Sequence, residues 1–279
     1  MAIVSISRGS NSRGTEVAEL VAERLGYECV AREALLEASD LYNIPRDELL
    51  RAIEDPPSLL ERLWKGKARY VATIRATVLR RLCADNIVYH GFAGHFFVRD
   101  ISHALKVRIL AEESDRVATA VEREGISAGE ARQRLLEQDK ARRQLAIHLY
   151  GTDAEDPSLY DLVLHVGKMG TDGAANVICD LIRQDIFVTT PASQAALADL
   201  ALAASVEAVL IDMDLDLSKM RVTADRGVVV VRLEKAPRTH AGSGSQFREH
   251  YMDSLGPHLR ERVAGLPGLK KLNLQHSKD

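Results

Sequence analysis

The chain has 279 residues, of which 37 are lysine or arginine and 40 are aspartate or glutamate, so its formal net charge at pH 7 is −3. This balance provides neither the basic field that binds nucleic acid nor a long acidic tail, and charge therefore indicates no polyanionic partner. Apolar residues make up 46% of the chain, which is enough for one large domain or two ordinary domains with packed cores.

Cysteine usage and hydropathy predict a cytoplasmic protein. The three cysteines stand far apart, at Cys29, Cys83 and Cys179. They are expected to be buried reduced thiols rather than a disulfide or a zinc site. The N-terminus lacks a charged start followed by a long apolar region, so no secretory signal is expected. The most apolar segment, 195–211, contains Asp199 and Glu207, which makes it a poor membrane span.

The first 25 residues carry the sharpest functional signal. Ala2–Ile6 is an apolar run typical of a β-strand, and apolar residues recur at helical spacing from Val17 to Leu25, where Gly26 ends the pattern. A polar turn, residues 7–15, lies between them and contains two arginines. A strand–turn–helix of this kind places unpaired backbone N–H groups and the positive end of a helix dipole at one point, where a phosphate can be held.

The spacing of the turn is close to that of a P-loop but not identical to it. Gly9 and Gly14 have the required separation, but Thr15 and Glu16 stand where a P-loop has lysine followed by serine or threonine. By spacing alone the turn fits equally well an ordinary strand-to-helix connection that is capped by Ser12.

Strands and helices alternate through the first two thirds of the chain. After the first strand, the pattern predicts strands at 27–30, 86–90, 105–110 and 159–166, and helices at 32–38, 114–124, 127–150 and 173–184. This alternation indicates a mostly parallel α/β sheet. Ligands of such sheets gather at the carboxyl ends of the strands, so Arg32 would face the same crevice as the first turn, unless it is a solvated surface arginine.

The predicted helix 127–150 has a capping box at its start and ends before Gly151. Arg132, Asp139 and Arg143 lie roughly on one face of it. A cluster of arginines on a mobile helix can fold over a bound nucleotide and neutralise a phosphoryl group in transfer. The alternative is an exposed helix with many salt bridges, which spacing alone favours.

Other candidate residues favour structural interpretations. His90 and His95 follow a predicted strand and could act in acid–base chemistry, but a lone histidine beside an apolar strand is usually structural. Asp212, Asp214 and Asp216 alternate as in a calcium loop, but the required glycine and closing glutamate are absent. The sequence therefore predicts no metal site made by protein side chains.

The pattern changes after Phe187. The remaining elements are a linker at 189–191, an alanine-rich helix at 193–208, strands at 219–224 and 227–233, a helix at 246–264 and a strand at 270–274. They predict a small α+β domain, and the chain is accordingly divided into domains 1–188 and 189–279.

Six separated motifs follow one another in a recognisable order. They are Ile6-Ser7-Arg8 with its turn and Gly14, Arg32-Glu33, the segment 91–100, Arg123–Ser127, Asp139–Arg142 and Tyr160-Asp161-Leu162. Their order resembles the cytidylate kinase-like family, a branch of the P-loop nucleoside monophosphate kinases, over about residues 1–185.

The resemblance implies a three-layer P-loop kinase fold and transfer of phosphate from ATP to a nucleoside monophosphate such as CMP, or to another small phosphate-bearing acceptor. It implies ATP and Mg²⁺ as cofactors, with the Mg²⁺ ligands unassigned. Catalytic roles would fall to Arg13, Asp139 and Arg142, and acceptor binding to Arg32 and Arg99. The ATP phosphates would be bound by Arg8, Gly9, Ser10, Asn11, Ser12, Arg13, Gly14 and Thr15.

The chain departs from the family pattern in three places. The loop lysine of ordinary cytidylate kinases is missing, as it often is in the cytidylate kinase-like branch. Glu16 stands where a serine or threonine is usual, and residues 91–94 read Gly-Phe-Ala-Gly where the branch usually has Gly-Arg-Gly. These departures support an alternative hypothesis, in which the first domain is a catalytically silent nucleotide sensor that reports to the C-terminal domain.

Residues 190–279 resemble a BON domain. The resemblance rests on three short segments, 216–218, 225–229 and 266–271. It implies that the C-terminal domain binds a lipid surface or a protein partner, although such a fold does not fix the function. In a third hypothesis the kinase fold is vestigial, and the protein functions through the interactions of this C-terminal domain.

Overall fold

The computed structural model describes residues 2–31, 37–39, 41, 45, 60–91, 93–213, 220–233 and 256–276. Arg32, Phe92 and the polar loop 237–245 lie outside these residues. The chain forms two compact units, one of residues 1–64 and 84–193 and the other of residues 65–83 and 194–279.

The first unit is built on a five-stranded sheet in which all paired strands are parallel. The strands are β1 (Ile3–Arg8), β2 (Glu28–Val30), β3 (Ile87–Tyr89), β4 (Ala104–Leu110) and β5 (Leu162–His165), in the order β2-β3-β1-β4-β5. β1 is central, and its apolar residues are fully buried, as expected for a parallel strand that is covered on both faces. The carboxyl ends of all five strands therefore meet at one edge.

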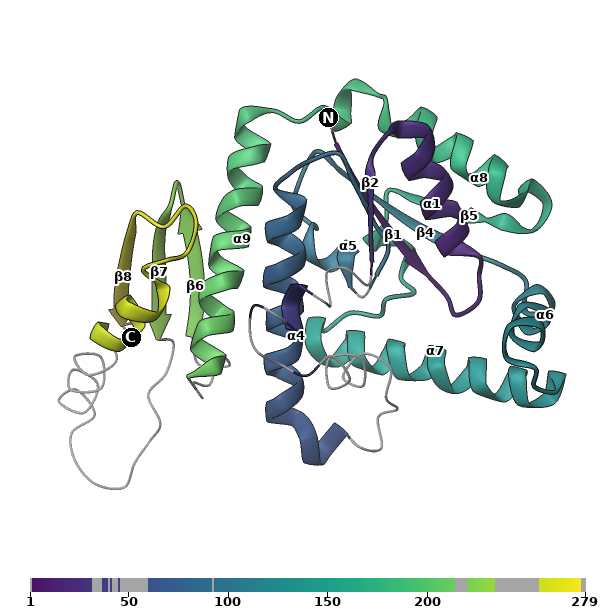
Figure 1. Cartoon of the computed structure of the whole chain (residues 1–279), viewed down its shortest axis with the longest axis horizontal. Helices are drawn as coiled ribbons and strands as arrows, with labels where there is room; N and C mark the ends of the chain where they lie inside the picture. Colours follow the sequence, from purple (N-terminus) through teal and green to yellow (C-terminus); the bar gives the residue numbers. More distant parts are fainter. Residues whose placement is uncertain are drawn as a thin grey trace. The chain divides into compact units, whose positions relative to one another are not determined.

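Helices lie between these strands in the sequence, and one more follows the last strand (Figure 1). They are α1 (Gly14–Leu25), α5 (Gly94–Phe97), α6 (Glu113–Glu124), α7 (Ala128–Tyr150) and α8 (Val166–Ile182), with short 3₁₀ helices at Pro157–Leu159 and Asp185–Phe187. α1 packs against α8, and α6 packs against α7. Val17 and Val21 of α1 share one apolar core with Ile178 of α8 and the strand residues Val107 and Ile109.

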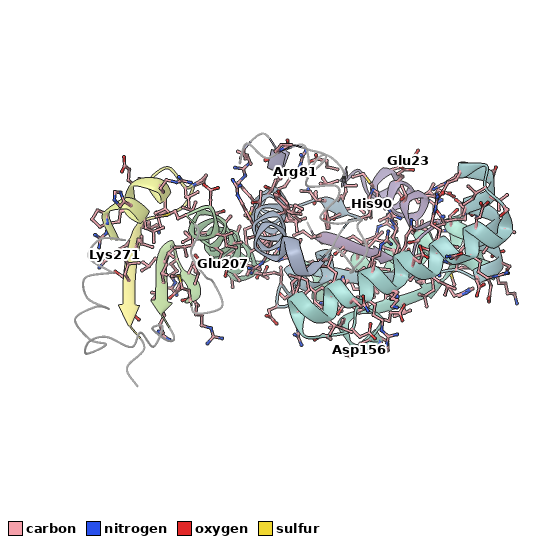
Figure 2. The ribbon with its side chains drawn as sticks, turned by 90° about the horizontal axis from the view of Figure 1, so that it is seen from below. Glu23, Arg81, His90, Asp156, Glu207 and Lys271 are labelled. Atoms are coloured by element: carbon pink, nitrogen blue, oxygen red, sulfur yellow. The ribbon has the colours of Figure 1, made fainter. Side chains whose placement is uncertain are left out.

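Local sequence signals fix the ends of these helices. The Ser127 hydroxyl accepts a hydrogen bond from the Glu130 amide, and the Glu130 carboxylate accepts one from the Ser127 amide, so the predicted capping box is confirmed. Gly26 and Gly151 end α1 and α7 with φ of 67° and 66°, a left-handed conformation that glycine adopts without steric cost. Asp156, labelled in Figure 2, caps the 3₁₀ helix that precedes β5.

The second unit contains a separate small sheet. Its strands are β6 (Met220–Asp225), β7 (Val228–Leu233) and β8 (Lys271–His276), and its helices include most of α4 (Leu60–Leu82) and α9 (Pro191–Asp212). β6 pairs with β7 antiparallel, and β7 pairs with β8 parallel. The similarity of this unit to a BON domain stays a prediction.

α9 is long and apolar enough to span a membrane by length and composition, but half of its most apolar window is buried inside the protein. All three of its acids are engaged within the second unit. The Asp199 carboxylate accepts hydrogen bonds from the amides of Arg226 and Gly227 at 2.7 and 3.0 Å, and Glu207, labelled in Figure 2, pairs with Arg75. Burial raises the pKa of Glu207. We interpret α9 as the core helix of this unit.

The passage from β1 into α1 requires a glycine. A Cβ atom at Gly14 would lie 2.7 Å from Cβ and 2.8 Å from Cδ of Arg8. Since the Arg8 Cβ is fixed by the backbone of β1, it has little freedom to move away. The side chain of Arg8 therefore lies directly against the first residue of α1, and Gly14 makes this approach possible.

A buried polar cluster holds the end of β1. The Tyr160 hydroxyl donates to the Ala154 carbonyl at 2.7 Å, and its oxygen lies 3.1 Å from Ser7 Oγ and 3.2 Å from His95 Nε2. Because the hydroxyl has one proton, we infer that Ser7 and His95 donate to its oxygen. Burial, together with the positive charge of Arg108, lowers the pKa of His95 to about 3, so its imidazole is neutral at physiological pH.

Gly14→Ala is expected to displace Arg8 or the start of α1, because the added methyl group collides with the Arg8 stem. We expect a loss of about 1–3 kcal/mol in the free energy of unfolding, measured by urea denaturation. Gly129→Ala, near the start of α7, is the control, because a Cβ there meets no atom within 4 Å. Equal stability of the Gly14→Ala and Gly129→Ala variants would contradict the close approach.

His95→Gln tests the neutral imidazole. The pKa of His95 is lower in the folded than in the unfolded chain, so the unfolded chain binds the proton first and stability falls as pH falls below about 6.5. Between pH 8 and pH 5.5 the wild type should lose about 1.4 kcal/mol more unfolding free energy than His95→Gln. Parallel pH profiles from urea denaturation would show that His95 is protonated as easily in the folded chain as in the unfolded one.

Candidate phosphate-binding site

The turn between β1 and α1 leaves the start of the helix uncapped. Arg13 is the N-cap residue of α1, with φ of 59°, and its side chain makes no capping hydrogen bond. The predicted alternative of a Ser12 cap is wrong, since the Ser12 hydroxyl donates to the Gly9 carbonyl at 3.0 Å. The amides in the first turn of a helix have no acceptor within the helix. They combine with the helix dipole to form a position that favours an anion.

Glu16, the acid in the first turn of α1, is neutralised by two arginines. Arg13 Nη2 lies 2.7 Å from Glu16 Oε2, and Arg123 Nη2 of α6 lies 3.4 Å from Glu16 Oε1. The hydrogen bond to Glu16 raises the pKa of Arg13. These side chains are about a third to a half exposed, so each pair contributes little stability and can exchange partners readily.

Both α6 and α7 contact the turn, which runs from the end of β1 toward these helices in Figure 1. Arg116 Nε of α6 donates to the Ser10 carbonyl at 2.8 Å, and its Nη2 lies 2.5 Å from Asp139 Oδ2 of α7. The Ser10 amide donates to Asp139 Oδ1 at 3.5 Å, the outer limit of a hydrogen bond. Arg142 Nη1 donates to the Arg8 carbonyl at 3.4 Å.

The Ser10 hydroxyl is a buried side-chain donor of the turn that has no partner among the described residues. Ser10 is 3% exposed, and its Oγ has no hydrogen-bond partner within the described part of the chain. A buried hydroxyl without a partner costs free energy, so a ligand oxygen that bonded to it would recover that cost.

The structure brings together most of the predicted site residues. The segment 8–15 lies at the carboxyl edge of the sheet, with Asp139 and Arg142 against it. Arg32 lies outside the described residues. Arg99 is exposed beyond α5, and within the described chain no hydrogen bond or ion pair joins it to the turn.

Sequence reasoning missed Arg116, and it named Arg123 in a family motif without giving it a role at the turn. These two residues are seven apart on α6, which places them on one face of the helix. The seven-residue spacing of these arginines could have identified them as candidates, because their helix directly precedes the arginine-bearing helix α7.

The donor set of the turn fits a polyphosphate. It consists of backbone amides, one orphaned hydroxyl and nearby guanidinium groups, all of which can donate to anionic oxygens. Among the residues that the structure describes, no group of three acidic, histidine or cysteine side chains could hold a metal ion. Magnesium in such sites commonly keeps several waters and is bound largely through the substrate phosphates.

Residues 3–168 match the sequence model of the Cytidylate kinase-like family. The chain is 33% identical to the cytidylate kinase of Thermococcus kodakarensis over 93 residues, which cover 33% of this chain and 47% of that protein. It therefore spans about half the length of this relative. The cytidylate kinase of Methanopyrus kandleri is 28% identical over 177 residues, which cover 63% of this chain and 90% of that protein.

A solved structure supports the same fold. The crystal structure of an uncharacterized protein from Eubacterium ventriosum superposes with a TM-score of 0.51 at 19% identity, covering 65% of this chain and 98% of that protein. This similarity concerns the fold alone. Because the family match extends over more than half of the sequence, the chain belongs to the cytidylate kinase-like family.

Proposed function

We propose that this protein is a nucleotide kinase that transfers phosphate from ATP to a nucleoside monophosphate. The observation that carries the proposal is the uncapped start of α1, with arginines of α6 and α7 held against the turn before it. Family membership supports a nucleotide kinase. The cytidylate kinases among its relatives make CMP the first acceptor to test.

The turn would hold the phosphates of ATP through the backbone amides of residues 9–15. Arg8, at the end of β1, and Arg142, on α7, would stabilise the charge that spreads over the transferred phosphoryl group. Arg13 would join them once it exchanges Glu16 for a phosphate oxygen. Magnesium, when bound, neutralises phosphate charge, and Arg32 and Arg99 are proposed for the acceptor.

Turnover tests the proposal directly. A coupled assay with ATP, Mg²⁺ and each nucleoside monophosphate should show ADP formation with at least one acceptor. Arg142→Ala should lower kcat/KM by at least about 100-fold, because it removes a preorganised charge. Arg134→Ala is the control on the same helix, since Arg134 pairs with Glu124 and not with the turn.

Absence of turnover with every acceptor would contradict the kinase assignment. ATP binding without turnover, measured by calorimetry, would instead support a catalytically silent nucleotide sensor.

Glu16→Gln tests whether the acid in the first turn restrains nucleotide binding. The substitution removes a negative charge from the start of α1 and frees Arg13 and Arg123 from their pairing. We expect ATP to bind about three to ten times more tightly, measured by isothermal titration calorimetry. Glu19→Gln, an exposed charge one turn later in α1, should change little. Weaker binding by Glu16→Gln would show that Glu16 takes part in holding the ligand.

A further inference from the structure

The phosphate-binding turn already contacts an anion that belongs to the protein. The two carboxylate oxygens of Asp139 are both engaged, Oδ1 by the Ser10 amide at 3.5 Å and Oδ2 by Arg116 Nη2 at 2.5 Å. Arg116 also donates to the Ser10 carbonyl at 2.8 Å. Its guanidinium lies over Gly9, since a Cβ there would be 3.6 Å from Arg116 Cζ. One guanidinium therefore joins the turn to the carboxylate.

These partners are the ones that a phosphate would use. A backbone amide of the turn and an arginine fork bind carboxylate and phosphate oxygens by the same charge-assisted hydrogen bonds. The side chains of Arg116 and Asp139 are only 17% and 29% exposed, so solvent screens this pair less than the arginine pairs of Glu16. Asp139 therefore engages donors that a phosphate in the turn would also need.

Asp139 leaves the Ser10 hydroxyl unused. Ser10 Oγ is buried and has no partner, and both oxygens of Asp139 are already engaged. A phosphate group presents at least three oxygens and can accept from an amide, a guanidinium and a hydroxyl together. The turn thus has at least one more donor group than the carboxylate satisfies.

We propose that Asp139 is an internal anion of the phosphate-binding turn, which the polyphosphate of ATP displaces. Arg116 passes from the carboxylate to the phosphate in this exchange and so is a binding residue for the polyphosphate. The displaced carboxylate frees α7 from the Ser10 amide, so polyphosphate binding is coupled to the position of this helix. The inference rests on the proposed function and specifies how its site is regulated.

Asp139→Asn tests the competition in the full-length chain. The asparagine amide keeps the size of the side chain and removes its charge. The probe is tripolyphosphate, which has no base or sugar. It should bind to Asp139→Asn at least about tenfold more tightly than to the wild type, measured by isothermal titration calorimetry. Glu137→Gln is the matched control, because it removes the same charge from α7 at an exposed residue whose carboxylate accepts from Gln133. Circular dichroism confirms folding, and Asp139→Ser serves as a second variant.

Arg116→Gln separates phosphate binding from a merely structural role. If Arg116 binds the polyphosphate, the substitution weakens tripolyphosphate binding by at least about tenfold even in the Asp139→Asn background, where no carboxylate remains to be paired. An Arg116→Gln substitution without effect in that background would overturn the role of Arg116.

Ser10→Ala gives an independent readout. It removes a hydroxyl that has no partner, so thermal stability without ligand should be unchanged or higher while tripolyphosphate affinity falls. Unchanged affinity would mean that the hydroxyl does not reach the phosphate.

The remaining outcomes distinguish the inference from the proposed function. If the wild type binds tripolyphosphate or ATP but Asp139→Asn binds it no more tightly, the internal anion is rejected and the nucleotide kinase stands. If neither the wild type nor any variant binds ATP or tripolyphosphate, both the proposed function and the inference are rejected.

Discussion

The candidate site depends on the backbone amides at the start of α1, which need hydrogen-bond acceptors that the helix does not supply. The first-turn amides of this helix have no acceptor within it, and Arg13 cannot cap them, so the end of the helix attracts negative charge. Glu16 from the helix itself and Asp139 from α7 both lie against this end of the helix or the turn before it, and each is paired with arginine. The charged contacts of the site therefore follow from one constraint, which a phosphate can satisfy more completely than a carboxylate.

Much of the first unit could be predicted because its signals are local. A capping box, helix-ending glycines and apolar periodicity each act within a few residues, and they placed the end of α1 and both ends of α7 correctly. The strand order β2-β3-β1-β4-β5 depends on pairing between distant segments, which such signals do not record. The grouping of residues 65–83 with the C-terminal unit could not be predicted either, because an apolar helix face has the same pattern whatever it packs against.

The candidate site could be proposed from the sequence, but its contacts could not. The glycine spacing and the strand before it identified the turn, whereas the residues that contact Ser10 lie 106 and 129 positions away. Residue type also left the capping group undecided. Serine is a residue type that often caps helices, yet the Ser12 hydroxyl donates to the Gly9 carbonyl, and Arg13, in a left-handed conformation, is the N-cap residue of α1. Such choices depend on backbone conformation, which is set only when the chain folds.

The most direct measurement follows the backbone amide resonances of residues 9–16 in the ¹⁵N-labelled chain as ATP is added. If the start of α1 is the anion site, the Ser10, Gly14 and Thr15 amides shift together and saturate at the concentration at which ATP binding itself saturates. The account would be contradicted by ATP that binds while these amide resonances stay in place.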